Sequence, residues 1–188
     1  MIAIGVTGSL SSGKSTVSKI IGGKKYPIFS ADKVVYELYK NALFVKNLKK
    51  QFKIKSSRDI KKSLKKLISL DKKILKKLEK YIHPHVRKKM FKFIKKNRKK
   101  KIIVLEIPLL IESKLMRFFD LIILVSSNKK TRLKRYIRNG GTKKTFNLLD
   151  KNQINVKKKI KYSNHTIHNN KPLGVLRDNV KLLISKYE

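Results

Sequence analysis

The sequence lacks cysteine, and this absence excludes disulfide bonds and thiolate metal sites. It also lacks an apolar run of about 18 residues, the length that a membrane-spanning helix requires. Its richest apolar stretch, IIVLEIPLLIE, is interrupted by Glu106 and Pro108. No basic segment precedes an apolar run at the start, so a signal peptide is not expected. We therefore expect a cytoplasmic protein that does not associate with membranes.

Acidic residues and tryptophan are also scarce. The chain has 11 acidic against 50 basic residues, a formal net charge of +39, and no tryptophan. The basic residues are 42 lysines and only 8 arginines, whereas specific nucleic-acid recognition relies on arginine and exposed aromatic rings. Because the lysines are scattered along the chain, we interpret the charge as compositional drift rather than as a specific nucleic-acid site. It would still attract polyanions in a salt-dependent way.

The length of 188 residues and the 40% hydrophobic content favour one compact domain with room for an inserted part. Apolar runs alternate with helical patterns, which predicts an α/β fold with a parallel sheet. Pro84 is expected in the first turn of a helix, and Pro172 at the start of the last helix. The predicted strands cover residues 2–7, 26–29, 101–108, 120–127 and 165–169.

The stretch GVTGSLSSGKST contains a phosphate-binding loop. Gly8, Gly13, Lys14 and Ser15 match G-x-x-x-x-G-K-[ST], between a predicted strand and a predicted helix. In such a loop the backbone N–H groups and the helix N-terminus face the phosphates. Lys14 would reach the β- and γ-phosphates, and Ser15 would bind Mg²⁺. The loop therefore predicts a site for a nucleoside triphosphate and a metal ion.

The remaining motifs favour a small kinase over a GTPase. NKKT at 128–131 has threonine where a guanine-binding motif has aspartate, and no Asp-x-x-Gly segment follows the predicted 101–108 strand. Asp32 follows the second predicted strand, at the end where open α/β sheets bind ligands. Its carboxylate could orient a hydroxyl acceptor. It could equally be a helix N-cap.

The chain resembles the dephospho-CoA kinase family. The matching segments are GVTG, Ser30-Ala31-Asp32, LEKYIHPHVR at 78–87 and IPLLIE at 107–112. A basic lid with Gln153, then Asn169, follows in the family's order. The resemblance implies a P-loop NTPase three-layer fold, with a core of about 1–31, 101–130 and 160–188. It also implies a helical acceptor-binding insertion at about 32–100 and a helical lid at about 131–159.

The resemblance implies transfer of the γ-phosphoryl group of ATP to the ribose 3′-hydroxyl of dephospho-CoA, the last step of coenzyme A biosynthesis, with Mg²⁺. It implies three catalytic residues, Asp32, Lys14 and Arg138, and a metal ligand, Ser15. The implied ATP-binding residues are Gly8, Ser11, Ser12, Gly13, Lys14, Ser15, Thr16, Arg135 and Asn169. The implied acceptor-binding residues are Asp32, His83, Arg87, Pro108, Leu109 and Glu112. Glu106 stands where strand ends often place an acid that orients water on magnesium.

Several alternatives stay open. His83 and Arg87 could have a structural role, and the role of Glu112 could be limited to a salt bridge with nearby lysines. The chain could be another small nucleoside or nucleotide kinase, a basic nucleic-acid-binding P-loop protein, or an inactive relative that binds only nucleotide. Ser9 and Ser11 replace family glycines, and a positive φ at either would cost about 1–2 kcal/mol. Ser30 replaces a family aspartate. We expect a monomer, although the oligomeric state is not encoded in any motif.

Overall fold

The structure is a computed structural model that describes residues 1–55, 59–71 and 73–188. The chain divides into two compact units. The first, the core unit, consists of residues 1–30 and 96–188, and the second, the helical unit, of residues 31–95. The predicted insertion at 32–100 overlaps the helical unit.

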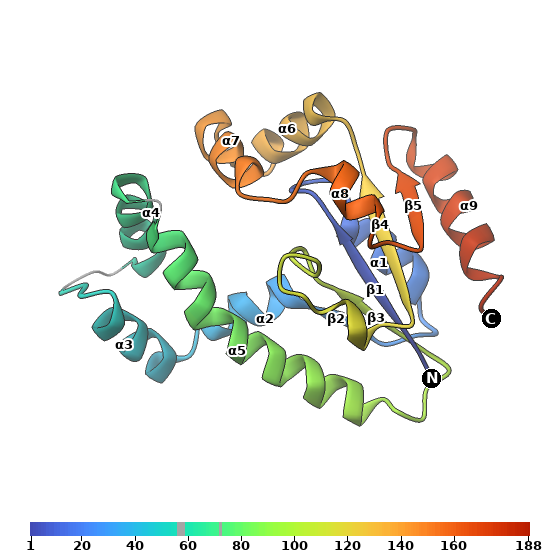
Figure 1. Cartoon of the computed structure of the whole chain (residues 1–188), viewed down its shortest axis with the longest axis horizontal. Helices are drawn as coiled ribbons and strands as arrows, with labels where there is room; N and C mark the ends of the chain where they lie inside the picture. Colours follow the sequence, from blue (N-terminus) through green and yellow to red (C-terminus); the bar gives the residue numbers. More distant parts are fainter. Residues whose placement is uncertain (56–58, 72) are drawn as a thin grey trace. The chain divides into compact units, whose positions relative to one another are not determined.

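A five-stranded parallel sheet forms the centre of the core unit, in the order β2-β3-β1-β4-β5 (Figure 1). The strands are β1 (Ile2–Gly8), β2 (Ile28–Ser30), β3 (Ile102–Glu106), β4 (Leu121–Ser126) and β5 (His165–His168). All five residues of β3 are buried, as are the first five of β4. Near-continuous apolar strands are typical of parallel sheets that are covered on both faces. The predicted α/β fold with a parallel sheet is therefore confirmed, with strand boundaries shifted by one or two residues.

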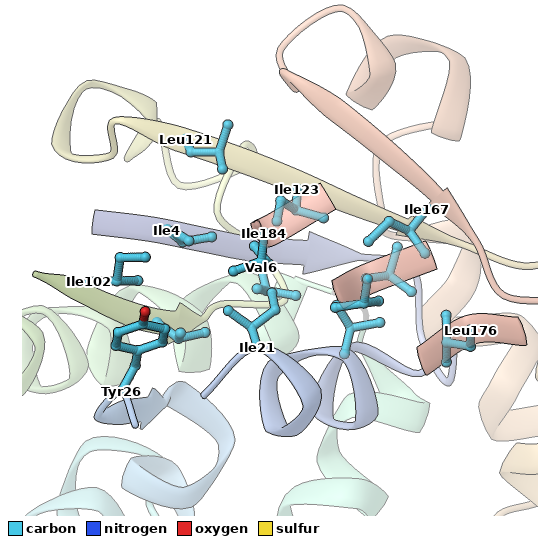
Figure 2. Close-up of a cluster of buried hydrophobic side chains, with 14 residues drawn as sticks. Ile4, Val6, Ile21, Tyr26, Ile102, Leu121, Ile123, Ile167, Leu176 and Ile184 are labelled. Carbon is cyan, nitrogen blue, oxygen red and sulfur yellow. The ribbon is translucent and has the colours of Figure 1, made fainter. Parts of the chain in front are cut away.

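One face of the sheet packs against α1 (Lys14–Gly22) and α9 (Leu173–Ile184). Figure 2 shows Ile4 and Val6 of β1 among this cluster, with Ile21 of α1 and Ile184 of α9. Successive strand residues alternate between faces, so Gly5 points the other way, towards Leu110 and Phe119. The segment after β3 thus covers part of the opposite face.

The remaining elements of the core unit follow β3 and β4. They are η1 (Met116–Phe118), α6 (Lys129–Arg138), α7 (Lys143–Lys151) and α8 (Val156–Ile160), and α8 lies against β4 (Figure 1). The three helices fall at 129–160, where a basic helical stretch is predicted. Pro172 caps the N-terminus of α9, as predicted.

Side chains also complete the sheet at the amino ends of two strands. The carboxylate of Asp120, just before β4, accepts a hydrogen bond from Ala3 N at 2.8 Å. The amide oxygen of Asn164, just before β5, accepts one from Ile122 N, also at 2.8 Å. Strand N–H groups that would otherwise lack a partner are satisfied in this way.

The helical unit contains α2 (Ala31–Leu38), α3 (Ala42–Gln51), α4 (Ile60–Leu70) and α5 (Lys73–Lys96). Asp59 caps α4 by accepting from Lys61 N and Lys62 N, and Asp71 accepts from Lys73 N. A separate apolar cluster holds the unit together: Phe44, Leu48, Ile60, Leu64, Leu78 and Ile82 are its buried members.

The prediction for Pro84 is wrong, because Pro84 lies inside α5 and not in a first turn. The physical reason is the spacing of the apolar residues. Leu78, Ile82, Val86 and Met90 follow one another at intervals of four, so one face of the helix stays apolar across the proline. This packing outweighs the hydrogen bond that proline cannot donate. Across the ranges that the structure describes, no helix is both long enough and apolar enough to cross a membrane.

Candidate active site

The phosphate-binding loop joins β1 to α1 and depends on two glycines with positive φ. Gly8 has φ 151°, and a Cβ there would lie 2.2 Å from the backbone oxygen of Val125. Gly13 has φ 98°, and a Cβ there would lie 2.1 Å from Nδ2 of Asn169. Neither position has room for a side chain. The glycines of the motif are therefore required by the close approach of neighbouring strands and loops.

The two unusual serines of the loop differ in conformation. Ser11 has φ 56°, in the left-handed region, whereas Ser9 is not among the described non-glycine residues with positive φ. Ser9 is buried instead, at 4% exposure. Of the two serines, Ser11 alone therefore carries the backbone strain of a positive φ, which costs about 1–2 kcal/mol.

Lys14 and Ser15 stand at the start of α1. Lys14 is 7% exposed, and its ammonium donates to the backbone oxygen of Ser9 at 3.0 Å, across the loop. Ser15 Oγ donates to Glu106 Oε1 at 2.5 Å, and Glu106 is 4% exposed at the end of β3. A buried ammonium, a helix N-terminus and a hydroxyl beside a carboxylate fit a triphosphate with Mg²⁺. The register explains the contact, because Glu106 lies opposite Val6 of β1.

Two predicted ATP-binding residues, Arg135 and Asn169, hold the backbone of the loop at Ser12. Asn169 Nδ2 donates to Ser12 O at 2.8 Å, and Arg135 Nη1 donates to the same oxygen at 3.3 Å. Arg135 also donates to the backbone oxygen of Asn169 at 3.1 Å. Ser12 is fully buried, and Thr16 is half-buried in the first turn of α1. Side chains from α6 and from the residue after β5 thus converge on the phosphate-binding loop.

Burial, followed by the nearby positive charge of Arg138, lowers the pKa of the Arg135 guanidinium from its ordinary value. Arg138 itself is exposed at the end of α6. An anion bound between these two guanidinium groups would relieve their mutual repulsion and would stabilise the charged form of the partly buried Arg135. This electrostatic arrangement suits a phosphate group.

Sequence reasoning did not find Arg132, which is 6% exposed in α6. Its Nη1 lies 2.5 Å from Asp150 Oδ1 of α7, and its Nε donates to Ser127 O at 3.1 Å. The same Nη1 lies 3.4 Å from the backbone oxygen of Leu10 in the phosphate-binding loop. Gln153, identified earlier only by resemblance, accepts from Leu10 N at 3.0 Å through Oε1.

The IPLLIE segment follows β3. Thr7 Oγ1 donates to the backbone oxygen of Pro108 at 3.1 Å, and Leu109 is half-buried. Glu112 Oε1 pairs with Lys159 Nζ of α8 at 2.8 Å, and it also accepts from Ile154 N at 3.2 Å. The Lys159 side chain is 0% exposed. The salt bridge that the sequence suggests for Glu112 is therefore present, and its partner is the buried Lys159 and not a surface lysine.

Asp32 lies exposed in the first turn of α2, two residues beyond Ser30, and Ser30 lies opposite Glu106 in the β2–β3 register. In the helical unit, His83 is half-buried and Arg87 exposed, both on α5. Burial, and then the charge of Arg87, lowers the pKa of His83, which favours its neutral form. His85 is exposed, although its ring packs against those of Phe44 and Tyr81.

The described residues contain no cluster of three or more histidine, cysteine, aspartate or glutamate side chains that could hold a metal ion by themselves. A bound Mg²⁺ would therefore need oxygen ligands from the nucleotide as well as Ser15. This matches the way in which Mg²⁺ is held in phosphoryl-transfer sites, by one or two protein groups and the substrate phosphates.

The chain was compared with known proteins. The family profile described as dephospho-CoA kinase matches residues 2–174. A dephospho-CoA kinase from Bartonella henselae is 33% identical over 98% of this chain and 97% of its own length.

Solved structures agree with the fold. A Thermus thermophilus protein superimposes with a TM-score of 0.80 and 26% identity, over 98% of this chain and 97% of that one. Dephospho-CoA kinase from Campylobacter jejuni superimposes with a TM-score of 0.64 and 25% identity, over 99% and 97%. The family match spans both units, and the loop, helices α6 to α8 and the IPLLIE segment all fall within it. The chain belongs to the dephospho-CoA kinase family.

Proposed function

We propose that this chain is a dephospho-CoA kinase that transfers the γ-phosphoryl group of ATP to the ribose 3′-hydroxyl of dephospho-CoA. The products are ADP and coenzyme A. The observation that carries the proposal is the loop geometry in a chain of this family. Gly8 and Gly13 leave no room for side chains, Lys14 bridges the loop, and Ser15 contacts Glu106.

Phosphoryl transfer depends mainly on positioning and on charge stabilisation. The Lys14 ammonium and the N-terminus of α1 bind the β- and γ-phosphates of ATP. Arg135 and Arg138 supply positive charge to the group in transfer. Ser15 would hold Mg²⁺, with Glu106 orienting the Ser15 hydroxyl, and the ion would supply charge neutralisation at the phosphate oxygens.

Asp32 orients the acceptor hydroxyl and accepts its proton. It follows the carboxyl end of β2, where open α/β sheets bind ligands. His83 and Arg87 of the helical unit, with Pro108 and Leu109 after β3, contribute to the binding of dephospho-CoA. Glu112 acts on the acceptor indirectly, since its carboxylate is engaged by Lys159 and Ile154 N. A monomeric, cytoplasmic enzyme without a specific nucleic-acid partner remains our prediction from the sequence.

ADP release tests the reaction. ATP and Mg²⁺ are supplied with dephospho-CoA, with nucleoside monophosphates or with RNA, each in a separate assay. We expect dephospho-CoA alone to stimulate ADP release, and formation of coenzyme A to match it. Stimulation by RNA would favour a nucleic-acid-dependent ATPase, and stimulation by a nucleoside monophosphate would favour a different small kinase. Either result without an effect of dephospho-CoA would refute the proposal.

The variant Asp32→Asn tests the catalytic role of this carboxylate. Loss of the proton acceptor should lower kcat by about 10²-fold or more, while ATP affinity stays unchanged. The matched control is Asp178→Asn, which neutralises another exposed aspartate, on α9. Turnover of Asp32→Asn at the level of this control would mean that Asp32 serves only the start of α2.

A further inference from the structure

We propose that Gln153 is a positioning residue that, together with Arg132, holds the backbone N–H and C=O groups of Leu10 and thereby keeps the neighbouring Ser11 in its left-handed conformation. The phosphate-binding loop of this chain would then be shaped by the helices that follow β4, and not by its own sequence alone. The inference extends the proposed function, but its main test requires only nucleotide binding.

The first observation is that both backbone polar groups of Leu10 are bonded by side chains from the segment that follows β4. Leu10 N donates to Gln153 Oε1 at 3.0 Å. Leu10 O lies 3.4 Å from Arg132 Nη1. A loop amide and a loop carbonyl are therefore held by two side chains that lie more than 120 residues away in the sequence.

Both side chains are themselves anchored. The side chain of Arg132 is 7% exposed, contacts Asp150 Oδ1 at 2.5 Å and donates from Nε to Ser127 O. Gln153 N donates to the backbone oxygen of Asp150 at 3.2 Å. The residue after Gln153, Ile154, donates its N–H to the buried pair of Glu112 and Lys159. The contact is thus part of a packed network rather than a chance surface interaction.

The second observation concerns the position of the strained residue. Ser11 has φ 56°, and its two neighbours are Leu10 and Ser12. Ser12 O accepts from Asn169 Nδ2 and Arg135 Nη1, so the residues on both sides of Ser11 each have a backbone group that is held by side chains from outside the loop. A conformation that serine disfavours persists only where the surrounding structure determines it. Gln153 and Arg132 supply that constraint on the Leu10 side.

Release of Leu10 would allow Ser11 to relax towards negative φ. The Ser12 amide, which donates to Ser9 O at 3.1 Å, would then turn. The amides from Gly13 to Ser15 would change direction with it, and these are the amides that face the phosphates in a loop of this type. The expected consequence is weaker binding of ATP, with no direct effect on the acceptor.

The test compares Gln153→Met, which keeps the side-chain length and removes the acceptor, with Asn152→Ala. Asn152, the residue that follows α7, is exposed, and in the described part of the chain its side chain bonds to Leu148 O. Affinity for ATP with Mg²⁺ is measured by calorimetry without acceptor. We expect the Kd of Gln153→Met to rise about tenfold, as for the loss of one hydrogen bond together with release of strain, and that of Asn152→Ala to stay unchanged. In turnover assays the KM for ATP should rise while the KM for dephospho-CoA does not.

The role in positioning Ser11 is separated from a general structural role by a double-variant cycle. Glycine adopts φ 56° without strain, so in a Ser11→Gly background the effect of Gln153→Met should fall below about threefold. Wild-type ATP affinity in Gln153→Met, or an equal loss in both backgrounds, would overturn the inference. If Gln153→Met does not fold, Gln153→Ala replaces it in the same cycle. Failure of dephospho-CoA to stimulate ADP release would refute the proposed function. It would not affect the inference about Gln153, because the ATP affinities are measured without acceptor.

Discussion

Replacement of Gly13 by alanine should damage both the fold and nucleotide binding, and its effect can be worked out from two separate terms. Gly13 has φ 98°, which places an L-residue under strain. The added Cβ would also lie 2.1 Å from Nδ2 and 3.3 Å from Cγ of Asn169. Asn169 would have to move and would lose its 2.8 Å hydrogen bond to Ser12 O.

The backbone term is about 1–2 kcal/mol for a non-glycine residue in this region. The lost hydrogen bond from a buried amide adds about 1 kcal/mol. We therefore expect Gly13→Ala to lower the free energy of unfolding by about 2–3 kcal/mol. Affinity for ATP should fall by about tenfold or more, because the Ser12 peptide is part of the loop that receives the phosphates.

Two other glycines provide matched controls. Gly23 has φ 51° with open space around its Cβ position, so Gly23→Ala carries the backbone term without the clash. Gly174 in α9 has neither feature, and Gly174→Ala should be neutral or stabilising by up to about 1 kcal/mol. Urea unfolding of all three is followed by far-UV circular dichroism, since the chain has no tryptophan. A Gly13→Ala variant no less stable than Gly23→Ala, or one with full ATP affinity, would refute the reasoning.

Two further predictions concern the buried ion pair and His83. Glu112→Gln leaves the buried Lys159 ammonium without its carboxylate and should cost about 3–5 kcal/mol in urea unfolding, and adding Lys159→Met should recover most of the loss; equal stability of the single and double variants would contradict this. The folded pKa of His83 lies below its ordinary value of 6.5, so the unfolded chain takes up the proton first as the pH falls. The stability from neutral His83 is therefore present above about pH 6.5 and is lost as the pH falls through the folded pKa, and His83→Gln should flatten this part of the curve of unfolding free energy against pH. An unchanged curve would show that burial of His83 is not linked to folding.

Much of the sheet could be predicted from the sequence because β1, β3 and β4 are short and almost entirely buried. The phosphate-binding loop could be predicted because Gly8, Gly13, Lys14 and Ser15 keep a fixed spacing. The prediction fails at Pro84 because a proline usually marks a helix boundary, whereas the apolar face of α5 runs through it. Local propensity was outweighed there by packing.

The rest of the site depends on contacts that no local pattern contains. Lys159 is fully buried, but it looks in the sequence like every other lysine of a lysine-rich chain. Arg132 differs from Arg135 only in which face of α6 it occupies. The contact of Gln153 joins residues 143 positions apart. Only the fold could decide which of Ser9 and Ser11 takes the left-handed conformation.

Most of the few carboxylates of this lysine-rich chain hold a specific interaction. Nine of the 11 acidic residues have a partner within the described structure, among them Glu106, Glu112, Asp120 and Asp150. Replacement of any of these residues would remove a specific interaction, in the interior for Glu106 and Glu112 and on the surface for Glu37 and Asp59. Within the described ranges, Asp32 and Asp178 have no such bond. Replacement of either should therefore leave every described bond in place, so a loss of turnover in Asp32→Asn but not in Asp178→Asn would report on catalysis and not on the fold.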